Sequence, residues 1–263
     1  MVKQIFICLS VLFVVVLCVN PPCYARYYSD QWEVESTDDF SGLILGMGAL
    51  YSTSPYEGVD DQVWPVPIIL GRYQRFYADG ASVGYVFHEM NQPKVDFSAV
   101  LAPRLMGYDS EDSDTLAGME DRDWSLDGGL RARYTNEYFR LTATGLIDLA
   151  GNHEGFEFST YISKTFFDGF LTPRFGIKVQ SEDLVDYYYG VPASEATATR
   201  LEYIGDTTVN IVAGVVLAAP LPWENWVAVA TFQYEHLGSE IEDSPIVDED
   251  GIFTYTGGVA YKF

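Results

Sequence analysis

The closing stretch of the chain, Phe253-Thr-Tyr-Thr-Gly-Gly-Val-Ala-Tyr-Lys-Phe263, alternates between two kinds of side chain. One face carries Phe253, Tyr255, Val259, Tyr261 and Phe263, and the other carries threonine, alanine and lysine. Alternation with a period of two residues indicates a β-strand that separates two different environments. Aromatic residues at the ends of the apolar face suit lipid, although an edge strand of a soluble sheet shows the same pattern. The rest of the chain must distinguish the two interpretations.

The same alternation recurs along the chain. It is clear over residues 95–104, 126–134, 139–148, 171–180, 208–217 and 226–235, and weaker over 43–51, 63–72, 76–88 and 156–166. Charged residues repeatedly occupy the polar face, and aromatic residues gather near the ends of the apolar face. Such aromatic girdles are typical of membrane barrels. We therefore predict an all-β, antiparallel transmembrane β-barrel over residues 42–263.

The number of strands follows from the turn signals. Eleven segments alternate, and a turn at Asp79-Gly80 divides residues 76–88 into two strands, one of them too short to span. Because bacterial barrels have even strand numbers, we predict twelve strands, with ten as the alternative. Pro65 and Pro67 are expected at a strand start or distortion rather than within a ladder.

The connections alternate between tight turns and long loops. Residues 52–62, 108–123, 181–203 and 238–250 are long and fall on one side of the predicted barrel, and two of these loops are strongly acidic. Outer-membrane barrels place long loops outside and tight turns in the periplasm. We therefore predict long acidic extracellular loops. In this setting, Tyr261 and Phe263 resemble the C-terminal signal that barrels present to the barrel assembly machinery.

The first residues predict export. Lys3, an apolar run and a small residue at Ala25 form a secretory signal peptide over residues 1–25. A transmembrane anchor is the alternative, but the run is shorter than the roughly 20 residues that a spanning helix needs. All three cysteines lie in this leader, so the exported chain is predicted to lack disulfides and thiolate metal sites. Residues 26–41 are polar and acidic, and we interpret them as a periplasmic tail.

The charge balance limits the partners. The chain has 38 acidic and 15 basic residues, a net charge of −23, which argues against nucleic acid. The expected surroundings are the lipid and lipopolysaccharide of the outer membrane. Clustered carboxylates in the loops around residues 111–123 and 240–250 favour a solvated acidic surface, with calcium binding as the alternative.

The histidines do not form a catalytic zinc motif. The histidines are His88, His153 and His236, and none belongs to an H-E-x-x-H zinc motif. We therefore predict a non-enzymatic protein without catalytic residues, cofactor or metal, and we place the histidines at strand ends or in loops.

Charges on the polar faces of the strands would line the barrel lumen. The predicted lumen charges are Arg104, Asp127, Arg131, Arg133, Arg140, Arg174 and Lys178. Charges in a narrow lumen need partners. We therefore expect either a plugged interior in which these charges pair, or a selective channel.

Several short motifs resemble those of one bacterial family. They are Tyr56-Glu-Gly58, Leu116-Ala-Gly-Met119, Tyr188-Tyr-Gly-Val191, Ser244-Pro-Ile-Val247 and the closing Tyr261-Lys-Phe263, in family order along the chain. Together they resemble the MipA/OmpV family of outer-membrane proteins, whose name refers to the MltA-interacting protein. This resemblance implies a barrel in the cell outer membrane. For part of the family, it implies a scaffold that joins a lytic transglycosylase to a bifunctional murein synthase. Other members are porin-like or adhesive, so a small-solute channel or an adhesin is the alternative.

Two aromatic groups are candidates for partner contact. Tyr187, Tyr188 and Tyr189 form either a recognition patch or a set of rings that packs a loop into the barrel mouth. The tail contains Tyr27, Tyr28 and Trp32 among acidic residues. Because the periplasmic face is predicted to consist mainly of tight turns, we expect this tail to be the main periplasmic contact.

Overall fold

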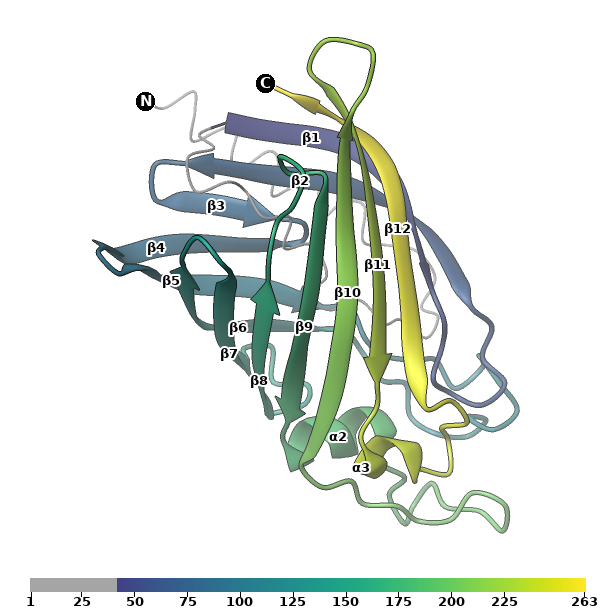
Figure 1. Cartoon of the computed structure of the whole chain (residues 1–263). Helices are drawn as coiled ribbons and strands as arrows, with labels where there is room; N and C mark the ends of the chain where they lie inside the picture. The colour runs from purple at the N-terminus through teal and green to yellow at the C-terminus, as the bar shows by residue number, and fades with distance from the viewer. Residues whose placement is uncertain (1–41) are drawn as a thin grey trace, which may run out of the picture.

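The computed structural model describes residues 42–263, which form one closed antiparallel β-barrel (Figure 1). The predicted signal peptide and periplasmic tail, residues 1–41, lie outside the described residues. Within the described part, helices long and apolar enough to cross a membrane are not found. The predicted fold class is confirmed, and the strand number is twelve.

The strands follow one another around the barrel, and the last pairs with the first. Their bounds are β1 (Gly42–Ser52), β2 (Gln62–Tyr73), β3 (Phe76–Asp79), β4 (Ser82–Asn91), β5 (Lys94–Arg104), β6 (Ser125–Thr135), β7 (Arg140–Asp148), β8 (Phe156–Ser163), β9 (Leu171–Gln180), β10 (Thr208–Pro220), β11 (Trp226–His236) and β12 (Gly251–Lys262). Two short helices, α2 (Glu182–Tyr189) and α3 (Ser239–Glu242), lie together at one end of the barrel (Figure 1).

The barrel closes where β1 meets β12. Met47 pairs with Val259, and Gly46 pairs with Ala260. The two backbones approach so closely here that a Cβ atom at Gly46 would lie 2.2 Å from the carbonyl oxygen of Val259. Only glycine leaves room for this approach, so Gly46 is required by the geometry of the closing seam.

Strand β3 has only four residues, as the Asp79-Gly80 turn signal predicts. It pairs with β2 only from Leu70 to Tyr73, so β3 leaves the outer part of β2 unpaired on that side.

The prediction for Pro65 and Pro67 is wrong, because both lie inside the β1–β2 ladder. The backbone N–H of Gly80 donates to the carbonyl oxygen of Ile69 at 2.9 Å, so odd-numbered positions of β2 turn their backbone polar groups toward β3. Pro65 and Pro67 share this parity. Since proline has no N–H, neither leaves an unpaired donor where β3 has ended.

The two faces of the wall differ as the alternation predicts. Leu130, Ile147 and Phe175 lie on the outward face and are more than half exposed on the isolated chain. Their neighbours on the inward face are polar, as in β7, where Thr142 and Thr144 are buried. In a membrane, the outward residues contact lipid, and the inward residues need partners within the barrel.

The β1–β12 seam predicts a specific cross-link. A chain beginning at residue 26 contains no cysteine, so the pair Met47→Cys and Val259→Cys would introduce the only two thiols. Because these positions are register partners on the outward face, oxidation of the folded barrel is expected to join them. Electrophoresis with and without reductant measures the product.

The matched control is Met47→Cys with Phe253→Cys, which lies on the same outward face. Six residues along a strand separate its second thiol from the register partner of Met47 by about 20 Å. Cross-linking of the control but not of the first pair would contradict this register.

Candidate functional site

The four long loops, residues 53–61, 105–124, 181–207 and 237–250, converge on one apolar core and form what we call the loop cap. Its buried side chains are Tyr56, Met106, Tyr108, Leu116, Met119, Leu184, Val185, Tyr188, Tyr189, Val191, Leu237, Ile241 and Ile246, joined by Ile252 of β12. The hydroxyl of Tyr56 donates to the carbonyl oxygen of Tyr188 at 3.3 Å, and that of Ser244 donates to the carbonyl oxygen of Tyr189 at 2.6 Å. Helices α2 and α3 belong to this cap (Figure 1).

Two arginines hold two loops of the cap, residues 105–124 and 181–207, to each other. Arg122 pairs with Glu195 at 3.1 Å, and its Nε donates to the carbonyl oxygen of Tyr187 at 2.8 Å. Arg200 donates to the carbonyl oxygens of Thr115 and Glu195. Loops distant in the sequence are therefore tied together by charged hydrogen bonds as well as by apolar packing.

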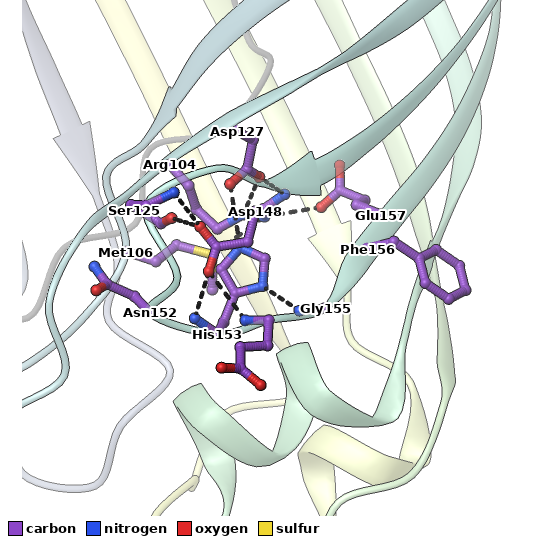
Figure 2. Close-up of polar contacts among 12 residues, drawn as sticks. Arg104, Met106, Ser125, Asp127, Asp148, Asn152, His153, Gly155, Phe156 and Glu157 are labelled. Atoms are coloured by element: carbon purple, nitrogen blue, oxygen red, sulfur yellow. Dashed lines mark hydrogen bonds and ion pairs between the residues drawn. The ribbon is translucent and has the colours of Figure 1, made fainter.

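Beneath the cap, a network of buried charges crosses the outer end of the lumen (Figure 2). Arg104 of β5 donates to Asp127 of β6 at 2.7 Å and to Glu157 of β8 at 2.9 Å. Gln180 of β9 donates to Glu157 at 3.2 Å. Figure 2 also shows Phe156 pointing away from this network, as the alternation along β8 requires.

His153 completes this network from the loop between β7 and β8. Its Nδ1 accepts a hydrogen bond from the backbone N–H of Gly155 at 3.1 Å, so the ring proton lies on Nε2. That Nε2 lies 3.1 Å from an oxygen of Asp127. His153 therefore joins a loop of the outer end to the barrel wall.

Asp127, Asp148 and His153 are close enough together to suggest a metal site. However, their ligand atoms already have partners. Asp148 accepts hydrogen bonds from the hydroxyl of Ser125 and from four backbone N–H groups, those of Ala150, Gly151, His153 and Glu154. The cluster is thus a structural junction that closes the β7–β8 loop.

A second charged pair lies beside this network, on β9 and β11. Lys178 of β9 and Glu235 of β11 are fully buried, with Nζ and Oε2 2.7 Å apart. Asn210 of β10, between them, donates to Glu235 at 2.8 Å and accepts from the N–H of Gly238 at 2.9 Å. This pair is therefore also connected to the loop cap.

The remaining predicted lumen charges lie nearer the periplasmic end. Arg131 and Arg133 are on β6, Arg140 is on β7 and Arg174 is on β9, all on inward rows. Arg131 lies 3.9 Å from Asp79, and Arg174 donates to the side-chain oxygen of Gln233. The structure thus divides the predicted charges into a group at the outer end and a group of arginines nearer the periplasmic end.

The aromatic residues predicted to contact a partner lie in different parts of the molecule and differ in burial. Tyr188 and Tyr189 are buried in the loop cap, so they pack the loop rather than face a partner, and Tyr187 is half-buried. Tyr27, Tyr28 and Trp32 lie outside the described residues. Tyr261 and Phe263 stack edge to face at the periplasmic end of β12, with ring centroids 4.9 Å apart.

Sequence reasoning did not identify the roles of His153, Arg122 and Arg200. The position of His153 in a loop was expected, but its pairing with Asp127 was not. A buried basic residue in an otherwise acidic loop is a weak signal, because sequence spacing does not show which distant loop supplies its partner. Two loops in fact contribute to the contacts of Arg122, its own through Glu120 and residues 181–207 through Tyr187 and Glu195.

The closed barrel, its lipid-compatible outer face and its charged interior define a β-barrel protein of the outer membrane. The model of the family described as MltA-interacting protein MipA matches residues 45–263. The chain belongs to this family, and the resemblance drawn from the motifs is confirmed.

Relatives in this family are similar over most of their length. Outer membrane protein OmpV of Vibrio cholerae is 30% identical, over 90% of this chain and 88% of its own. Outer membrane protein YiaT of Escherichia coli K12 is 28% identical, over 85% and 92%. The MltA-interacting protein of Escherichia coli K12 is 26% identical, over 83% and 89%.

The buried pair of Lys178 and Glu235 predicts a large loss of stability on substitution. Lys178→Met removes the cation and leaves Glu235 charged inside the lumen. We expect the free energy of unfolding to fall by about 3–5 kcal/mol, because one charge remains buried without its partner. Urea unfolding in lipid vesicles measures this value. The double variant Lys178→Met, Glu235→Leu is expected to recover part of the loss, and a single variant as stable as the original would contradict the pairing.

The loop cap predicts a response to alkaline pH. Burial raises the pKa of Tyr56, Tyr108, Tyr188 and Tyr189 above the ordinary value. A pKa that is higher in the folded protein gives stability that is present below the unfolded value, about 10, and is lost as pH rises beyond it. We expect these tyrosines to ionise only as the cap opens.

Tyrosinate absorbance and protease cleavage of the loops, recorded over the same pH series, test this prediction. Tyr73 and Tyr138 are exposed and lie outside the loop cap, so they serve as internal controls. Ionisation of every tyrosine near pH 10, with the loops still resistant to protease, would be incompatible with a buried cap.

Proposed function

We propose that this protein is a non-conducting, non-enzymatic scaffold of the outer membrane that binds a murein-cleaving lytic transglycosylase from the periplasmic side. A bifunctional murein synthase would be the second enzyme of the assembly. The observation that carries the proposal is the loop cap, together with the paired charges beneath it. Apolar packing of residues from all four loops favours a closed outer mouth over a channel for small solutes.

The family supports the choice of partner. A relative similar over most of this chain is named MltA-interacting protein, and the shared family extends that interaction to this chain as a proposal. Relatives in the family are named as outer-membrane or interacting proteins, which supports the non-enzymatic assignment.

The periplasmic face offers aromatic residues on its tight turns. Tyr138, Phe167 and Trp223 lie on the turns after β6, β8 and β10, and each is at least 66% exposed. The hairpin between β10 and β11 extends beyond its neighbours (Figure 1). Aromatic side chains provide large, rigid contact area, so this hairpin is the described element that best complements a contact by residues 26–41.

A capture experiment tests the scaffold. The chain from residue 26 onward, solubilised from outer membranes in detergent, is used as bait, and mass spectrometry identifies the proteins retained. A lytic transglycosylase or a murein synthase is the expected result. Deletion of residues 26–40 should weaken retention, and unchanged retention would contradict a main contact in the tail. Trp223→Ser, with exposed Tyr73→Ser as a matched control, tests the hairpin in the same way.

Conductance in a planar bilayer tests the closed mouth. We expect no discrete openings from the folded barrel, because the loop cap and the charge network fill the outer end. Reproducible single-channel currents, together with failure to retain a periplasmic enzyme, would favour the channel alternative and overturn the scaffold proposal.

A further inference from the structure

The barrel wall is interrupted on the outer side of the short hairpin formed by β3 and β4. Strand β3 pairs with β2 only from Leu70 to Tyr73, and β4 pairs with β5 only up to Leu101. Within the described barrel, residues 62–68 of β2 and 102–104 of β5 therefore have no neighbouring strand on the sides where β3 and β4 have ended. Figure 1 shows β2 continuing past the end of β3. We call this interruption the wall break.

The wall break faces the outer leaflet of the membrane. Residues 62–68 are the outer end of β2, and these seven residues span about 20 Å along the strand. A strand tilt of about 40° reduces this length to about 15 Å across the membrane, which is half of a hydrocarbon core about 30 Å thick. Val63 and Leu101 lie on the outward face beside the wall break and are 69% and 43% exposed on the isolated chain. The wall break is therefore continuous with the surface that contacts lipid.

Prolines occupy both edges of the wall break. Pro65 and Pro67 belong to the positions of β2 whose backbone polar groups turn toward β3, and beyond the end of β3 they face the wall break. On β6, the carbonyl oxygen of Leu126 accepts from the backbone N–H of Leu149 at 2.9 Å, so Leu126 turns toward β7. Its register partner on β5, Pro103, therefore turns away from β6 and toward the wall break.

These edges are poorly suited to pairing with a further strand. Because proline has no N–H group, Pro65, Pro67 and Pro103 offer no donor to a ladder. A strand from a second copy of the chain would lose a hydrogen bond at each of these positions. Carbonyl oxygens without a partner are tolerated better than N–H groups without one. An occupant that forms no hydrogen bonds therefore costs less here than at an ordinary strand edge.

The inner wall on both sides of the wall break is apolar. On β2, Ile68 and Leu70 belong to one buried cluster, and Val66 packs against it. On β5, Val100 and Ala102 belong to another. Outside the loop cap, these two are the hydrophobic clusters of buried residues found in the described part of the chain. Apolar lumen surface is thus concentrated on the two strands that border the wall break.

We propose that an acyl chain of a lipid from the surrounding membrane enters the lumen through the wall break and lies against these two clusters. Hydrocarbon requires no hydrogen-bond partner, and it gains dispersion contacts with the apolar side chains on either side. The loop cap covers the outer mouth, so the acyl chain enters from the side of the barrel. This inference is independent of the proposed scaffold role.

Quenching of tryptophan fluorescence by brominated lipid tests the proposal, because bromine on an acyl chain quenches an indole on contact. Trp64 lies on the same inward side of β2 as Val66 and Ile68 and is partly buried. A variant of the chain from residue 26 onward keeps Trp64 and has phenylalanine at the other four tryptophans, which are Trp32, Trp124, Trp223 and Trp226. It is folded into phosphatidylcholine vesicles with brominated or unsubstituted acyl chains. We expect bromination to reduce the emission of Trp64.

Two single-tryptophan controls set the scale. Trp226 lies on the outward face and is 39% exposed, so a chain that keeps only this residue reports direct contact with lipid. Tyr161→Trp, in a chain without other tryptophans, places an indole on the inward face of β8, where Tyr161 is buried. The loss of emission from Trp64 should be similar to that from Trp226, and Tyr161→Trp should show little loss.

A matched pair of substitutions locates the contact. Val66→Gln, added to the chain that keeps Trp64, puts a polar group beside the apolar cluster of β2 and should reduce the quenching. Val63→Gln makes the same change on the outward face of the same strand and should leave the quenching unaltered. The heat-dependent electrophoretic mobility of each variant shows that it is folded.

Equal emission from Trp64 in the two kinds of vesicle would overturn the proposal. Equal quenching of Trp64 and Tyr161→Trp would also overturn it, because bromine would then act through an intact wall. Quenching that Val66→Gln leaves unchanged would contradict contact with the cluster on β2. Unquenched Trp64 in barrels that sediment as dimers would assign the wall break to a second copy of the chain instead of lipid.

Discussion

The whole structure depends on one requirement: inside a bilayer, the chain must satisfy its own backbone hydrogen bonds. Closure of β1 against β12 meets this requirement at the seam, where Gly46 lets the strands approach. The short β3 strand makes this requirement harder to meet, because it leaves the outer part of β2 without a neighbouring strand on one side. Pro65 and Pro67 reduce the cost at this edge because they bring no N–H group to it. Gly46 and the two prolines look unrelated in the sequence, but all of them help the barrel to satisfy its backbone hydrogen bonds.

The interior follows a related rule for charge. At the outer end, Arg104 bridges two carboxylates, and Lys178 pairs with Glu235, so the buried charges largely compensate one another. Toward the periplasmic end, Arg131 lies 3.9 Å from Asp79, and Arg174 donates to the side-chain oxygen of Gln233.

The acidic loops illustrate how local composition can mislead. Their carboxylates suggested a solvated surface, and many of these side chains are indeed exposed. Yet the apolar residues between them, such as Leu116 and Ile241, meet in one core that only forms when four loops fold together. The same assembly determines the environment of Tyr188 and Tyr189, which became packing residues. An isolated loop contains too few apolar residues to predict this outcome.

The sequence alone determined the barrel, the inward rows of charge and the family, because alternation and ordered motifs are local properties of the chain. It also predicted twelve strands with a short one at Asp79-Gly80. The tertiary structure decided the ladder around Pro65 and Pro67, the pairing of His153 with Asp127 and the core of the loop cap. Each of these depends on which distant segments become neighbours when the barrel closes. Contacts between residues far apart in the sequence cannot be predicted from a local pattern.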